Sequence, residues 1–262
     1  MKPPLLEFDK VTLLRARRRR ILDAVSLKIP EGQNVAILGP NGAGKSSLIK
    51  LIIREYYPLA QDGGSFKIWG QGSWDVFSLR SLLGIVSNDL QYACNRGITG
   101  REMVLSGFFS SIGLFKERLT PAMKRKTAQV IEFLEIGHLQ DRAMDHMSSG
   151  EARRFLIARA LVHDPKALVL DEPTNSLDLH ALFKFRDTLR KIAKSGTSII
   201  LVTHNLSDII PEINRVILMK RGRIYKDGPK ASVLTGRNIT QLFGASVEII
   251  TKGGYYYSLL LS

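Results

Sequence analysis

Short apolar runs alternate along this chain with segments in which apolar residues recur at helical spacing. The runs at 34–38, 167–170, 198–202 and 215–219 have the length of buried strands, and the pattern at 46–54 predicts a helix directly after the first of them. This alternation is typical of an α/β fold whose sheet is largely parallel. We therefore predict an α/β core built on these strands.

The two ends of the chain have a different pattern. Residues 5–13 and 21–29 predict two strands of an antiparallel element, and Gly253-Gly254 predicts a late hairpin turn. Both features indicate that antiparallel structure flanks the parallel core.

The middle of the chain is helical in pattern, over 101–111, 121–135 and 137–142. We interpret it as a helical subdomain inserted into the core. The prediction is one domain over 1–262, in which 1–89 and 150–262 form the core and 90–149 form the helical subdomain.

The composition is that of an ordinary globular protein, with 44% hydrophobic and 24% charged residues, which excludes a wholly disordered, collagen-like or coiled-coil chain. No apolar run approaches the ~20 residues that span a bilayer. The start, Met1-Lys-Pro-Pro, lacks the pattern of a signal peptide, and the single cysteine, Cys94, fits a reducing compartment. We expect a cytoplasmic protein.

The chain is basic, with 38 Lys and Arg against 24 Asp and Glu, a net charge of +14. Such a charge suits binding to nucleic-acid phosphates or to anionic lipid headgroups, and it also keeps a protein soluble. Composition does not choose between these alternatives.

A glycine-rich loop lies between the strand at 34–38 and the helix at 46–54, and it fits G-x-x-x-x-G-K-[ST] in the context that this motif needs. Its backbone amides can form a nest for phosphate oxygens, and the helix N-terminus adds its dipole. A glycine-rich turn is the alternative, but the strand and helix on either side favour phosphate binding. The predicted binding residues are Gly39, Pro40, Asn41, Gly42, Ala43, Gly44, Lys45, Ser46 and Ser47.

Two acids end the apolar strand at 167–170. Asp171, at the carboxyl end of a parallel strand, is predicted to bind Mg²⁺ together with the Ser46 hydroxyl. Glu172 leaves the strand on another face and is predicted to polarise the attacking water as a general base. A solvated acid pair is the alternative.

The segment Met147-Ser-Ser-Gly-Glu151, followed by a helical pattern, resembles the signature motif of ATP-binding-cassette (ABC) ATPases. Pro173–Asp178 is similar to the D-loop of that family, and Val202-Thr-His204 is similar to its switch histidine. Together with the glycine-rich loop these motifs stand in family order, and the resemblance extends from about residue 5 to 228.

The resemblance implies a P-loop NTPase core of mostly parallel sheet, an antiparallel β subdomain and an inserted helical subdomain. It implies ATP and Mg²⁺ as ligands, with Lys45, Glu172 and His204 as catalytic residues. It also implies a dimer, in which Ser148 and Gly150 of one subunit close on the ATP held by the other.

Three positions depart from the family pattern. Asn88 is predicted to stand where the family has a metal-contacting glutamine, and Gln91 is a weaker candidate. The asparagine amide is one methylene shorter, so its contact with the metal is either bridged by water or lost. Ser149 limits backbone freedom where the family has glycine, and Glu151 adds a negative charge, so we expect slower dimer closure. In place of an aromatic residue against adenine, Arg15 or Arg17 is predicted to stack on the base, unless the arginine run is a solvated loop.

The resemblance predicts the ATP-hydrolysing subunit of a membrane transporter. Its expected partners are membrane-spanning permease subunits and a second, identical ABC subunit, which would place it at the inner face of the membrane. The alternative is a soluble ABC ATPase acting on ribosomes or nucleic acid, which the charge favours but the single phosphate loop disfavours, so we do not expect a nucleic-acid partner.

Residues 103–115 resemble a subgroup related to molybdate-transport ATPases, which suggests an anion or metal as cargo. Phe108, Phe109, Ile112 and Phe115 are predicted to pack in the core or to line a groove for a permease helix.

Overall fold

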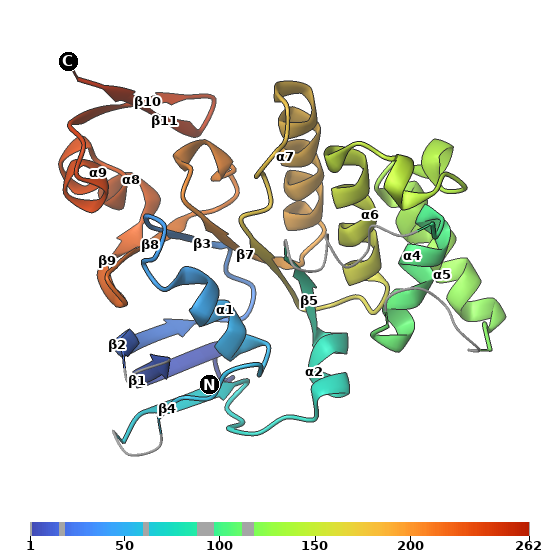
Figure 1. Ribbon diagram of the computed structural model, residues 1–262, viewed down its shortest axis with the longest axis horizontal. Coiled ribbons are helices and arrows are strands. Elements are labelled where there is room, and N and C mark those ends of the chain that lie inside the picture. Colours follow the sequence, from blue (N-terminus) through green and yellow to red (C-terminus); the bar gives the residue numbers. More distant parts are fainter. Residues whose placement is uncertain (1, 16–18, 60–62, 88–96, 112–117, 262) are drawn as a thin grey trace. The chain divides into compact units, whose positions relative to one another are not determined.

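The structure is a computed structural model that describes residues 2–15, 19–59, 63–87, 97–111 and 118–261 (Figure 1). The chain forms two compact units, which are described separately below. The first combines Met1–Val76 with Ser198–Ser262, and the second is Phe77–Thr197.

An antiparallel sheet opens the first unit, in the order β2-β1-β4. Its strands are β1 (Leu6–Arg15), β2 (Arg19–Ile29) and β4 (Ser65–Ile68). Phe8 of β1 stacks on Phe66 of β4, with ring centroids 4.3 Å apart. The two antiparallel strands predicted near the N-terminus are thus confirmed, and β4 adds a third strand that the pattern did not predict.

The parallel strands of the first unit lie around β3 (Val35–Leu38), which pairs with β7 (Ser198–Thr203) and β8 (Arg215–Lys220). β9 (Arg223–Pro229) runs antiparallel to β8. Every residue of β3 is buried, as expected for a strand covered on both faces. Since Leu38 pairs with both Thr203 and Leu218, the carboxyl ends of these strands lie at one edge, where α1 (Lys45–Ile52) begins.

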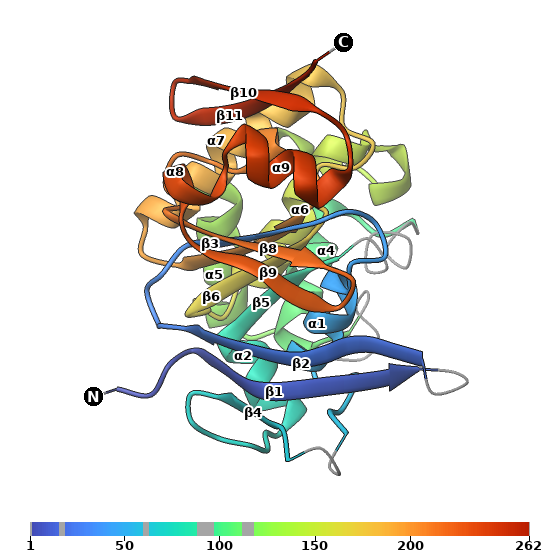
Figure 2. The same cartoon turned by 90° about the vertical axis from the view of Figure 1, so that its left-hand side faces the viewer.

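The C-terminal part of the first unit contains α8 (Lys230–Val233) and α9 (Gly236–Phe243), followed by a hairpin of β10 (Val247–Lys252) and β11 (Tyr255–Leu260). Gly253 and Gly254 form its two-residue turn with φ of 60° and 80°, the left-handed pair that such a turn requires. The predicted hairpin is confirmed. Figure 2 shows this hairpin and the β2-β1-β4 sheet at opposite ends of the first unit.

The second unit contains a parallel strand pair and a group of helices. The strands are β5 (Leu83–Val86) and β6 (Ala167–Asp171), and the helices are α2 (Val76–Leu82), α4 (Gly100–Ser106), α5 (Pro121–Phe133), α6 (Ser149–Leu161) and α7 (Leu179–Lys194). α6 contacts α4, α5 and α7 and lies between them (Figure 1). The predicted α/β fold, with mostly parallel strands and a separate antiparallel sheet, is confirmed.

Two predicted helices of the second unit are shorter than expected. The helix predicted over 101–111 ends at Ser106 and continues only as a 3-10 turn, Gly107–Phe109. The segment 137–142 is not an α-helix and contains only a 3-10 turn, Gly137–Leu139. The carbonyls of Gln140 and Arg142 accept hydrogen bonds from the first two amides of α4 instead of bonding within a helix of their own. A long-range contact therefore overrides the local pattern.

α7 is not among the predicted helices. Its signal was present in Asp178, whose carboxylate caps the helix by accepting from the Ala181 amide at 2.8 Å, and in Phe185, Leu189 and Ile192, which are buried on one face. Among the described residues, no helix has both the length and the apolar character needed to cross a membrane.

α4 and α6 approach each other closely where Phe155 meets Gly100. Phe155 is fully buried, and a Cβ at Gly100 would lie 2.5 Å from its ring.

We predict that Phe155→Ala lowers the free energy of unfolding by about 3–5 kcal/mol, because the ring fills space that the helices cannot close. Urea denaturation followed by circular dichroism measures this change. The control is Phe77→Ala, whose side chain is 68% exposed and which should change the same free energy by no more than about 0.5 kcal/mol. Equal effects would contradict the prediction.

Candidate nucleotide-binding site

The phosphate loop, Gly39–Ser46, joins the end of β3 to the start of α1. Gly42 and Gly44 have φ of 76° and 102°, a left-handed conformation that glycine adopts without steric cost. Gly44 is the N-cap of α1, so no N-cap side chain occupies the first amides of the helix. Those amides and the positive end of the helix dipole suit an anion such as phosphate.

Lys45 is held inside this loop. Its side chain is almost fully buried, and its ammonium donates to the carbonyls of Gly39 at 2.8 Å and Pro40 at 3.1 Å. These bonds hold the lysine ammonium within the loop, where phosphate oxygens can also accept hydrogen bonds from a cation. The loop therefore suits a polyphosphate such as ATP in backbone conformation and in the sign of its charge.

His204 lies beside the phosphate loop in the first unit. It follows β7 directly, and the Gly39 amide donates to the Thr203 carbonyl at 3.3 Å. The parallel pairing of β3 with β7 thus brings the start of the phosphate loop next to the residue before His204, although the two are far apart in the sequence. Thr203 further shapes this turn, because its hydroxyl accepts from the Asn205 amide at 3.0 Å.

The back of the phosphate loop is supported by the β8–β9 turn, which the sequence predicts as a turn at 220–223 but without any contact to the loop. The Gly222 amide donates to the Ala43 carbonyl, and the Gly222 carbonyl accepts from the Asp23 amide, both at 2.9 Å. Gly222 joins β8 to β9 with φ of 79°, and a Cβ there would lie 2.4 Å from the Ile21 carbonyl oxygen. The loop, the β8–β9 turn and β2 are therefore joined through a position that only glycine fits.

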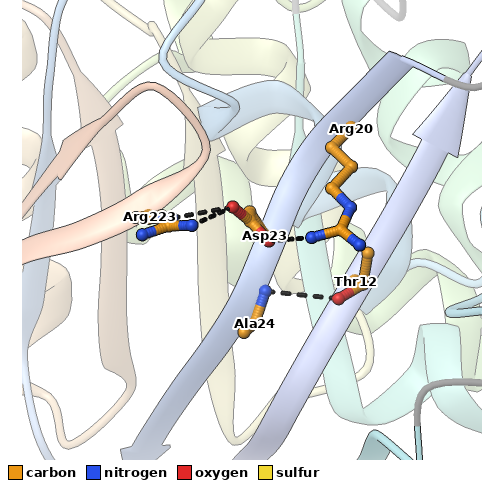
Figure 3. Close-up of polar contacts among 5 residues, drawn as sticks. All are labelled: Thr12, Arg20, Asp23, Ala24 and Arg223. Atoms are coloured by element: carbon orange, nitrogen blue, oxygen red, sulfur yellow. Dashed lines mark hydrogen bonds and ion pairs between the residues drawn. The ribbon is translucent and has the colours of Figure 1, made fainter.

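Asp23 of β2 bonds to Arg223, the first residue of β9, and to Arg20 of its own strand (Figure 3). Its carboxylate accepts from Arg20 at 3.0 Å and from Nε of Arg223 at 2.7 Å. Hydrogen bonding from Arg223 holds the pKa of Asp23 below its ordinary value, so the carboxylate is ionised at neutral pH. In the same strand, the Ala24 amide donates to the Thr12 hydroxyl of β1 at 3.2 Å.

In the second unit, the predicted acids lie at the end of β6. Asp171 is the last residue of the strand, and Glu172 follows with φ of 47°, a left-handed conformation that is uncommon outside glycine. Asn175 donates from its side-chain amide to Oε2 of Glu172 at 2.9 Å. Oxygen donors such as the Asp171 carboxylate and the Ser46 hydroxyl are the type that Mg²⁺ prefers.

The signature segment, Met147–Glu151, begins α6 as predicted. Ser148 is the N-cap, and it forms a capping box, in which its hydroxyl accepts from the Glu151 amide while its own amide donates to Glu151 at 2.9 Å. This bond from the Ser148 amide lowers the pKa of Glu151. The spacing Ser-x-x-Glu was a sequence signal for this box that the analysis missed.

Two further residues of the signature segment contact neighbouring elements. The Ser149 hydroxyl donates to the Ser176 carbonyl at 2.9 Å. Gly150 is buried, and a Cβ on it would lie 2.6 Å from Cβ of Ala181 in α7. Both contacts place the start of α6 against the segment that follows Glu172.

The remaining predicted residues have other positions. The Arg15 guanidinium lies 5.9 Å from the ring centroid of Tyr56. Phe108 is half-buried and meets the ring of His163 edge-on, at 5.3 Å between centroids, and Phe109 is half-buried as well. Other predicted positions lie outside the described residues, namely Arg17, Asn88, Gln91, Ile112 and Phe115.

Known sequences are similar to this chain over most of its length. The family model described as "ABC transporter" matches residues 22–175, more than half of the chain. The chain is 33% identical over 251 residues to the ABC transporter ATP-binding protein YlmA of Bacillus subtilis, which covers 94% of this chain and 93% of that protein. It is 31% identical over 253 residues to the hemin import ATP-binding protein HmuV of Bradyrhizobium diazoefficiens, over 94% and 91% of the two chains.

Solved structures are also similar. CbiO1 of Clostridium perfringens, part of the ABC transporter complex CbiONQ, superposes with a TM-score of 0.77 at 25% identity, over 92% of this chain and 94% of that one. An inward-facing ABC transporter of putative metal-chelate type gives a TM-score of 0.78 at 21% identity, over 99% and 98%. At that identity the second likeness shows the fold alone.

The support behind the phosphate loop gives a prediction for Asp23. We expect Asp23→Asn to weaken the binding of ATP and of inorganic triphosphate alike, by roughly twofold to fivefold, because loss of the ion pairs loosens the turn that holds Ala43. Titration with a fluorescent ATP analogue, and its displacement by triphosphate, measures both affinities.

The matched control is Asp227→Asn. Asp227 forms an ion pair with Arg215 at 2.6 Å in the same β8–β9 hairpin, at the end away from the turn. This variant should bind both ligands as the parent does. If the two variants weaken binding equally, Asp23 has no specific effect on the phosphate loop.

Proposed function

We propose that this chain, which belongs to the ABC transporter family, powers a membrane transporter through ATP-driven closure of a dimer. As a member of this family the chain is an ATP-binding subunit and an ATPase. The observation that carries the proposal is the buried Lys45 ammonium in a glycine loop, beside the strand that ends before His204.

In the proposed reaction, the amides of the phosphate loop and Lys45 bind the β- and γ-phosphates of ATP. Glu172 takes a proton from water as the water oxygen attacks the γ-phosphorus, and the bond to the bridging oxygen of ADP breaks. His204 donates to the γ-phosphate and so senses whether ATP or ADP is bound. Mg²⁺ bound by Ser46 and Asp171 would neutralise part of the phosphate charge. The assignments of Asn88 as a further metal ligand and of Arg15 as the residue against adenine stay predictions.

We propose that two copies of this chain form the dimer. The N-terminus of α6, with Ser148 and Gly150, would close on the ATP of the partner, where its amides and dipole suit the γ-phosphate. Glu151 opposes that charge, but its carboxylate is already bonded to the Ser148 amide. Closure would move membrane-spanning permease subunits, which would hold this chain at the cytoplasmic face of the membrane.

The cargo we propose is a metal chelate, taken up by import. The support is that the similar proteins include hemin import ATP-binding proteins, of Bradyrhizobium diazoefficiens at 31% identity and of Escherichia coli at 30%. The predicted likeness to molybdate-transport ATPases is not confirmed by these relatives. A soluble ABC ATPase acting on ribosomes or nucleic acid is not favoured, since the relatives named above are transporter proteins.

The assignment of Glu172 gives the next prediction. Glu172→Gln should keep ATP affinity and lower kcat by about 10²-fold or more, because the amide cannot take the proton. It should also form a stable dimer with ATP, measured by size-exclusion chromatography with light scattering. Glu135→Gln is the control, since Glu135 pairs with Lys191 on the surface, and it should hydrolyse ATP as the parent does. Hydrolysis by Glu172→Gln at the parent rate would exclude Glu172 as the base.

The transporter role is tested by capture. Tagged Glu172→Gln is held closed with ATP, purified in mild detergent from its native cells and examined by mass spectrometry. We expect a polytopic membrane protein to co-purify at stoichiometric yield, together with a chelate-binding component. Ribosomal or nucleic-acid material that is lost at high salt, without a membrane partner, would support the soluble alternative instead.

A further inference from the structure

Asn175 contacts the proposed general base twice within one turn. Its backbone amide donates to the Glu172 carbonyl at 3.3 Å, and its side-chain amide donates to Oε2 of Glu172 at 2.9 Å. Both residues are half-buried at the end of β6. The left-handed backbone of Glu172 makes this turn tight enough for the side chains to meet.

We propose that Asn175 is a positioning residue for Glu172, holding Oε2 so that Oε1 is the oxygen presented to the attacking water. This inference rests on the proposed function, in which Glu172 is the general base. A glutamate side chain has three rotatable bonds, and a general base must lie within hydrogen-bond reach of the proton it takes. The amide of Asn175 can donate but cannot take a proton, so it orients the carboxylate without competing for the proton.

The signature helix holds the same turn from the other side. Ser149 donates to the Ser176 carbonyl at 2.9 Å, and Nη1 of Arg153 donates to the Glu172 carbonyl at 3.4 Å. These two residues are four apart in α6 and therefore lie on one face of the helix. Arg153 is buried, which keeps its side chain in place. α6 thus bonds to Glu172, before Asn175, and to Ser176, after it.

Ser149 has a specific part in this arrangement, because a glycine at this position has no hydroxyl to donate. The departure from the usual signature sequence therefore adds a bond between the start of α6 and the turn that carries Glu172. We infer that movement of the signature segment on dimer closure reaches Glu172 of the same chain through this bond.

The test measures ATP hydrolysis by full-length variants at saturating ATP, together with KM and the melting temperature. We expect Asn175→Ala to lower kcat about tenfold, because a small displacement of a reacting group is costly. Asn175→Asp, of nearly the same shape but with a like charge against Glu172, should lower kcat further. KM for ATP should stay within about twofold of the parent in both, since neither change touches the phosphate loop.

Two more variants separate positioning from stability. Asn175→Ser keeps a residue that favours turns, so its melting temperature should equal that of the parent. Its hydroxyl is too short to reach Oε2 of Glu172, so its kcat should fall by the same factor as that of Asn175→Ala. Ser149→Gly should lower kcat about twofold. The matched control is Ser195→Ala, which removes a hydroxyl bonded to the Ile192 carbonyl at the far end of α7 and should leave kcat unchanged.

A double-mutant cycle with Glu172→Gln gives the deciding result. If Asn175 acts through the carboxylate, Asn175→Ala should not lower the residual rate of Glu172→Gln any further. If it lowers that rate by the same factor as in the parent, Asn175 does not act through Glu172 and the inference is overturned. If Glu172→Gln is inactive but Asn175→Ala and Asn175→Asp have the parent kcat, only this inference fails. If Glu172→Gln itself has the parent rate, the proposed general base fails and this inference falls with it.

Discussion

The burial of the Lys45 ammonium is the constraint on which the candidate site depends. A cation is expensive to bury unless hydrogen-bond acceptors surround it, and here the carbonyls of Gly39 and Pro40 provide two. These carbonyls point at the lysine only because the chain turns between β3 and α1 through left-handed glycines. The same turn makes Gly44 the N-cap of α1, so no side chain caps the first amides of the helix. One backbone conformation thus holds the lysine and forms the candidate anion site.

That conformation is supported by elements distant in sequence. β7 on one side of β3 supplies the Thr203 carbonyl, which accepts from Gly39, and the β8–β9 turn supplies the Gly222 amide, which donates to Ala43. The ion pair of Asp23 with Arg223 joins β2 to that turn. This pair is partly exposed and weak by itself, so the support comes mainly from the backbone hydrogen bonds.

Much of this could be predicted from the sequence. Buried strands that end in Leu38, Asp171 and Thr203 were visible as apolar runs, because a strand covered on both faces needs continuous apolar residues. The phosphate loop could be predicted because glycines and a lysine at this spacing, between a strand and a helix, are typical of phosphate binding. α7 was missed although its apolar residues recur at helical spacing, and 137–142 was predicted as a helix although its carbonyls bond to α4.

The contacts that the sequence did not predict share a physical cause, since each depends on where a side chain meets another element. Nothing in the composition of Pro173–Asp178 indicates that Asn175 would meet Glu172 rather than solvent.

Ser149 is the clearest case, because from the sequence alone serine in place of glycine is only a loss of backbone freedom. In the folded chain the same substitution gains a donor, and its acceptor, the Ser176 carbonyl, belongs to the turn that holds Glu172. The lower backbone freedom of serine and the added hydrogen bond have the same expected effect, because each restricts movement of the start of α6 relative to the turn after β6. A signature segment of this kind gives up flexibility at the proposed dimer contact, and it gains a hydrogen bond to the turn that carries the proposed general base.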